Sequence, residues 1–93
     1  MDEYTVSHNP ERMRYELRKG DLPIGFADAI PRGDAVVVPH VEISPEFEGQ
    51  GLGSKLVRGM LDDLRAHGKK VEPVCPFVVA FFRRNPDYSD LRA

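Results

Sequence analysis

The sequence predicts a small mixed α/β domain. Antiparallel strands lead to a central strand, a glycine loop, a helix, a parallel strand and a second short helix. Three observations predict this order: apolar residues alternate near the N-terminus, a helical spacing follows near the middle, and three glycines separate the two patterns. With 93 residues, the chain is long enough for one domain and one core, so we expect a single domain over residues 1–93.

The first strands are predicted from alternation. Residues 12–18, "RMRYELR", place apolar and charged side chains on opposite sides, which is typical of a half-buried strand. The tripeptide "KGD" predicts a turn, and residues 22–30, "LPIGFADAI", predict a second strand. We therefore expect an antiparallel hairpin, followed by another turn at "PRGD".

The central strand is predicted at residues 35–44, "AVVVPHVEIS", the segment richest in β-branched residues. The run "VVV" indicates burial on both faces. Pro39 cannot donate a hydrogen bond, so it marks a bulge or a point where pairing stops. Backbone groups left unpaired there would be available to a ligand.

A helix, a strand and a second helix are predicted after the glycines. Apolar residues recur every three or four positions over 52–66, and "HG" ends that helix. Residues 69–75, "KKVEPVC", form a short strand, and a strand, helix and strand in this order predict a parallel crossover. Pro76 suits the first position of a second helix over 76–85, followed by a turn and tail.

Composition narrows the function classes. The formal charge is −2 with no concentrated basic face, so no nucleic-acid partner is expected. No apolar run approaches the ~18 residues of a membrane span, and the N-terminus shows no signal segment, so a cytoplasmic protein without a membrane partner is expected. A single thiol, Cys75, agrees with a reducing compartment. No metal site is expected.

The glycine loop, residues 49–53, indicates an anion site. A helix start offers unpaired N–H groups and a partial positive charge, and glycines let the backbone bend so that these groups converge. The spacing matches neither a P-loop nor a dinucleotide fingerprint. A flexible turn without a ligand and a phosphate-binding domain of another type stay open as alternatives.

The stretch "VEISPEFEGQGLGSKLVRGMLDDLRAHG" resembles the acetyl-CoA-binding motif of GNAT-type N-acetyltransferases, [QR]-x-x-G-x-[GA], which falls on residues 48–53. With the strand before it and "KVEPVCPFVVAFFRRNPDY" after it, the resemblance to the compact, single-domain members of that family covers residues 13–91. It implies a GNAT-like fold and acetyl-CoA as co-substrate.

The resemblance also implies which residues hold the cofactor. Loop amides would bind the pyrophosphate, and the backbone of the central strand would run beside the pantetheine arm. The implied residues are Gly49, Gly51, Gly53 and Ser54, with Gln50 lining the loop, and Val41, Glu42 and Ile43 on the strand. Glu48 stands where Gln or Arg is expected, and its carboxylate would repel a pyrophosphate. Lys55 and Arg58 could offset that charge.

Three residues are candidates for catalysis. His40 shares a strand face with Glu42 and has the intrinsic pKa of a general base, although a structural histidine is an equal alternative. Cys75 precedes a helix start and could carry a transient acetyl group, or could be a small buried residue. Tyr88 could protonate the leaving thiolate, or could anchor the tail. His8 and His67 are expected at the surface.

The sequence therefore predicts an acetyl-CoA-dependent N-acetyltransferase. Its acceptor would be a small amine or an exposed protein amino group. The alternative is a non-catalytic module of the same fold that binds a coenzyme A thioester without turning it over.

Overall fold

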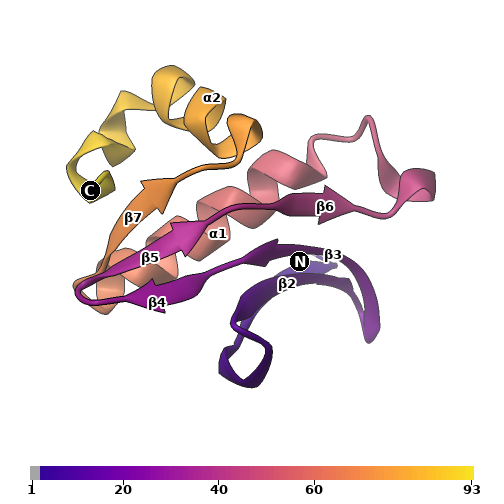
Figure 1. The fold of residues 1–93 in the computed structure, drawn as a ribbon. Helices are drawn as coiled ribbons and strands as arrows, with labels where there is room; N and C mark the ends of the chain where they lie inside the picture. The colour runs from indigo at the N-terminus through magenta and orange to yellow at the C-terminus, as the bar shows by residue number, and fades with distance from the viewer. Residues whose placement is uncertain (1–2) are drawn as a thin grey trace.

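The computed structural model describes residues 3–93; Met1 and Asp2, which the expected domain includes, lie outside the described residues. The strands form two sheets, one of four strands and one of three, with α1 along one face and α2 beyond β7 (Figure 1). In chain order the strands and α-helices are β1 (Tyr4–Asn9), β2 (Arg14–Lys19), β3 (Leu22–Asp28), β4 (Ile30–Arg32), β5 (Ala35–Val38), β6 (Val41–Ile43), α1 (Leu52–Ala66), β7 (Lys70–Pro73) and α2 (Pro76–Arg84).

The predicted hairpin is confirmed as β2 and β3, which pair antiparallel. Side chains alternate between the two faces of β2. Tyr15 and Leu17 are buried in the core, whereas Glu16 lies on the opposite face. Strand β1, which the sequence analysis did not predict, pairs with the other edge of β2. The four-stranded sheet then has the order β1-β2-β3-β6.

The predicted central strand is divided at Pro39, as expected. Strand β5 ends at Val38 and pairs antiparallel with β4 and parallel with β7, which confirms the crossover. Strand β6 begins at Val41 and pairs instead with β3. The chain therefore passes from one sheet to the other across Pro39 and His40, and β6 and β7 diverge from this point (Figure 1).

The core lies between the strands and the apolar stripe of α1. Every residue that the helical spacing marked as apolar is buried there: Leu52, Leu56, Val57, Met60, Leu61 and Leu64. At Gly59 the helix lies so close to β1 that an added Cβ would be 2.7 Å from Val6. Helix α2 contributes Val78, Phe81 and Phe82 to the core, whereas Phe77 of the same helix is partly exposed.

Two further elements differ from the expectation. The residues expected as the turn "PRGD" begin inside β4, and the turn itself is shorter, with Gly33 at φ +63°. The expected tail is a 3₁₀ helix, η3 (Pro86–Leu91), after which Arg92 forms a parallel bridge with Val71. Within residues 3–93, no helix combines the length and apolarity needed to cross a bilayer.

The face of the sheet opposite α1 holds a buried carboxylate. Glu16 is only 5% exposed and accepts hydrogen bonds from Arg18 (2.7 Å), Arg14 (3.0 Å) and Asn9 (3.3 Å). Burial alone would raise the pKa of Glu16, but the hydrogen bonds from Arg18, Arg14 and Asn9 favour the charged form and lower it overall. The ionised carboxylate therefore stabilises the fold.

This arrangement predicts a pH-dependent stability. Because the folded pKa of Glu16 is lowered, its contribution is present above the unfolded pKa of about 4.3 and is lost as the pH falls below it. Glu16→Gln should lower the free energy of unfolding at pH 7 by about 1–3 kcal/mol, and the difference should shrink below about pH 4. Denaturant unfolding at both pH values measures this, with the exposed Glu11→Gln as control. An equal difference at pH 7 and pH 3 would refute it.

Candidate functional site

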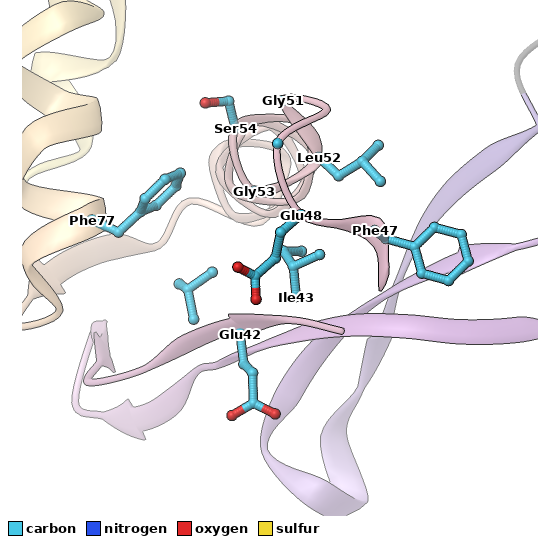
Figure 2. A pocket seen from close by; sticks show the side chains of 11 residues that line it. Glu42, Ile43, Phe47, Glu48, Gly51, Leu52, Gly53, Ser54 and Phe77 are labelled. Carbon is cyan, nitrogen blue, oxygen red and sulfur yellow. The ribbon is translucent and has the colours of Figure 1, made fainter. Parts of the chain in front are cut away.

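A pocket of about 440 Å³ opens where α1 begins (Figure 2). Its walls come from β6, from the loop after it, from the first turn of α1 and from α2. The lining residues are Val41, Glu42, Ile43, Phe47, Glu48, Gly49, Gly51, Leu52, Gly53, Ser54 and Phe77. All the cofactor residues predicted from the sequence are in this set except Gln50, which is exposed and does not line the pocket.

The loop bends through two glycines in the left-handed region. Gly49 has φ +81° and Gly51, the N-cap of α1, has φ +74°, a conformation that residues with a Cβ rarely adopt. In residues 3–93, the first N–H of α1 to find a backbone acceptor is that of Lys55, which donates to the Gly51 carbonyl at 3.2 Å. The N–H groups of residues 52–54 precede it, so they remain available at the pocket wall.

Gly53 has a packing role as well. A Cβ built on Gly53 would lie 2.9 Å from Cζ of Phe77, because the Phe77 ring packs against the first turn of α1 (Figure 2). Phe77 is still 36% exposed and forms the apolar wall of the pocket on the α2 side. The third glycine thus lets the two helices approach each other beside the free amides.

Strand β6 contributes an open backbone edge. Within residues 3–93 it pairs only with β3, where Asp28 N–H donates to His40 O and Ser44 N–H donates to Ile24 O. Because the hydrogen-bonding direction alternates along a strand, the peptide groups of Val41 and Ile43 point to the other edge. That edge faces the pocket, which both residues line.

The charged side chains among the lining residues are both negative. Glu48 projects into the space between the helix start and β6, whereas Glu42 points to the far side of the strand (Figure 2). Arg58, expected to offset Glu48, instead donates to Asn85 at 2.9 Å and lies over the rings of Phe81 and Tyr88. Neither Lys55 nor Arg58 lines the pocket.

His40 lies beside the strand break and outside the pocket lining. Its Nε2 is 3.0 Å from Oε1 of Glu42, which confirms that the two side chains share a face, and its ring is 5.8 Å from that of Phe26. Both partners are more than half exposed. A carboxylate only accepts hydrogen bonds, so Nε2 carries the proton and the lone pair of the neutral ring is on Nδ1.

Cys75 follows β7 and lies near the point at which β6 and β7 begin to diverge. It is 8% exposed and is the N-cap of α2, and its N–H donates to the Val38 carbonyl at 3.0 Å. The N–H of Val74 donates to the same carbonyl at 3.2 Å. The thiol is therefore near the point at which β5 ends, although it does not line the pocket.

Tyr88 does not line the pocket. Its hydroxyl donates to Oδ1 of Asp62 at 2.6 Å, and its ring is buried in the core beside Phe81. Burial raises the pKa of Tyr88, and the hydrogen bond to the Asp62 carboxylate raises it further. This geometry fits the alternative in which Tyr88 anchors the tail to α1.

Most of the chain matches one protein family. The model of the GCN5-related N-acetyltransferase family matches residues 14–91. The chain belongs to this family. The match includes β6, the glycine loop, both helices and Cys75. No curated protein matches the chain.

Solved structures show the same fold for this family member. A GCN5-like protein from Staphylococcus aureus superposes with a TM-score of 0.72 at 17% identity, covering 100% of this chain and 91% of that one. The ribosomal-protein-S18-alanine N-acetyltransferase of Escherichia coli superposes with a TM-score of 0.64 at 17% identity, covering 90% of this chain and 52% of that one. The IAA acetyltransferase of Bacillus cereus superposes with a TM-score of 0.60 at 18% identity, covering 76% of this chain and 51% of that one. This chain thus spans about half the length of the last two proteins.

Sequence reasoning missed three apolar residues of the pocket: Phe47, Leu52 and Phe77. Leu52 and Phe77 lie in the first turns of α1 and α2. Both helices begin at the pocket, so apolar residues of these turns line it. For Phe47 the usable signal was its place just before the glycine loop. An aromatic residue there packs against the core and fixes where the loop starts.

Proposed function

We propose that this chain is an acetyl-CoA-dependent N-acetyltransferase that acts on an amine. One observation carries the proposal: free N–H groups at the start of α1 and the unpaired edge of β6 line the same pocket. The first can bind a diphosphate, and the second can bind the amide groups of an extended chain. Coenzyme A joins these two chemical features in one molecule.

The residues fit such a ligand. The N–H groups of Leu52, Gly53 and Ser54 would hold the pyrophosphate, and Gly49 and Gly51 keep side chains away from it. The peptide groups of Val41 and Ile43, on either side of Glu42, would bind the pantetheine arm, with Phe77 as an apolar wall. When bound, the thioester supplies the activated acetyl group.

His40 is the proposed general base. Glu42 fixes its tautomer, so Nδ1 can take a proton from an attacking amine. The pocket lies on the helix side of β6 and Glu42 points to the other side (Figure 2), so the cofactor and the amine would approach from opposite faces and meet at the strand break. The acceptor would be a small amine or an exposed protein amino group.

Cys75 supports two routes. In the direct route the amine attacks the thioester carbonyl, its proton passes to His40 and coenzyme A leaves as a thiolate. In the second route the Cys75 thiolate first takes the acetyl group and releases coenzyme A, and the amine then attacks the acetyl-cysteine. The position of Cys75 at the end of β5 permits either route.

A second candidate is a module that binds a coenzyme A thioester without turnover. The exposure of His40 and Glu42 favours it, because side chains more than half open to solvent do not enclose an acceptor. The Tyr88 hydroxyl donates a hydrogen bond to Asp62, which supports the alternative in which Tyr88 anchors the tail.

Two measurements test these functions. Coenzyme A at a hundredfold excess over its Kd should stabilise the fold by about 2.7 kcal/mol, and acetyl-CoA should be consumed in the presence of a panel of amines. Stabilisation without consumption would identify the binding module. Neither stabilisation nor consumption at millimolar concentrations would contradict both functions.

A further inference from the structure

The anion site contains a feature that opposes its own ligand. Glu48 lines the pocket, and its carboxylate lies between the helix start and β6 (Figure 2). No lysine or arginine in residues 3–93 lines the pocket beside it. A glutamate in water carries a negative charge at neutral pH, so a diphosphate bound to the amides of Gly53 and Ser54 would meet a like charge.

The backbone on both sides restricts where Glu48 can point. Before it, the 3₁₀ turn η2 (Pro45–Phe47) ends with the Glu48 N–H donating to Pro45 O at 3.3 Å, and Phe47 packs against the core. After it, the chain turns at once through Gly49 at φ +81°. The Glu48 side chain therefore leaves an anchored backbone, in the direction of the pocket.

We propose that Glu48 sets the affinity of this site, weakening the binding of diphosphate ligands in proportion to their charge. The proposal rests on the proposed function, because it concerns the same pocket. At a solvated site a single charge removed from beside a diphosphate changes binding by about tenfold at low salt. Glu48 thus favours rapid release of coenzyme A, and it leaves uncharged ligands of the β6 edge unaffected.

The test compares Glu48→Gln with a matched control, Glu46→Gln. Glu46 is an exposed glutamate two residues away that does not line the pocket. The Kd of coenzyme A and of S-acetylpantetheine, which lacks the phosphates, is measured for each protein at about 50 mM and 500 mM salt. We expect Glu48→Gln to bind coenzyme A about tenfold more tightly at low salt and with a smaller gain at high salt. S-acetylpantetheine should show no change, and the control should match the parent protein.

Other outcomes separate the role of Glu48 from the proposed function of the chain. Equal or weaker binding of coenzyme A by Glu48→Gln, with clear binding by the parent, would overturn the role of Glu48 alone. An equal gain for S-acetylpantetheine would also overturn it, because the effect would then be steric. If neither protein binds coenzyme A, the proposed function fails, and the role of Glu48 fails with it.

Discussion

Gly51→Glu should abolish the stabilisation of the protein by coenzyme A. At a hundredfold excess over Kd, the ligand should stabilise the parent by about 2.7 kcal/mol, or raise the Tm by about 10–20 °C. Gly51 is the N-cap of α1 and lines the pocket, and open space surrounds the position of its missing Cβ. A glutamate there would put a side chain and a negative charge in the proposed diphosphate site, so the shift in Tm should vanish.

Gly20→Glu is the matched control for this variant. Gly20 also has a left-handed φ, +59°, with nothing within 4 Å of an added Cβ, and it is in the turn between β2 and β3. Both variants should lose about 1 kcal/mol of stability from backbone strain, but Gly20→Glu should keep the full ligand-induced shift. If Gly51→Glu kept the shift as well, the diphosphate would bind elsewhere.

His40→Ala should lower kcat by about 10²–10⁴-fold while leaving the stabilisation by coenzyme A unchanged. In the proposed function the imidazole takes the proton of the amine, and a positioned base contributes about this factor. His40 does not line the pocket, so its loss should not affect cofactor binding. Steady-state acetyl transfer and thermal shift, measured on one preparation, separate the two effects.

His67→Ala is the control, because His67 is exposed at the far end of α1. Glu42→Gln should act through His40 and lower kcat, since Glu42 fixes the protonated nitrogen. If His40→Ala retained full kcat while Cys75→Ala lost it, the base would have to be another group. The acetyl-cysteine route would then be favoured.

The parts of the fold that were predictable have local causes. Pro39 lacks an N–H, so it had to interrupt a ladder, and the strands separate there. The glycines at 49 and 51 require backbone angles that other residues avoid, and they form the turn into α1. Strand β1 was not predicted, because short polar edge strands depend on their partner, here β2, more than on their own pattern.

Long-range pairing was beyond the sequence. Tyr88, the candidate acid, donates a hydrogen bond to Asp62, 26 residues earlier in the chain. Arg58, the candidate counter-charge to Glu48, donates to Asn85 instead. Both contacts join α1 to the C-terminal part of the chain. The direction of Glu48 is likewise set by the packing of Phe47 and by the turn at Gly49. Spacing predicted which residues are near the loop, but not which ones face into it.

The most direct test of the account is a titration of the ¹⁵N-labelled protein with coenzyme A, followed by amide NMR. If the free N–H groups at the start of α1 bind the diphosphate, the amides of Leu52, Gly53 and Ser54 should show the largest shifts. The same amides should stay near their free positions with pantetheine, which lacks phosphate and should shift Val41 and Ile43. Saturable binding of coenzyme A that leaves residues 52–54 unperturbed would contradict the account.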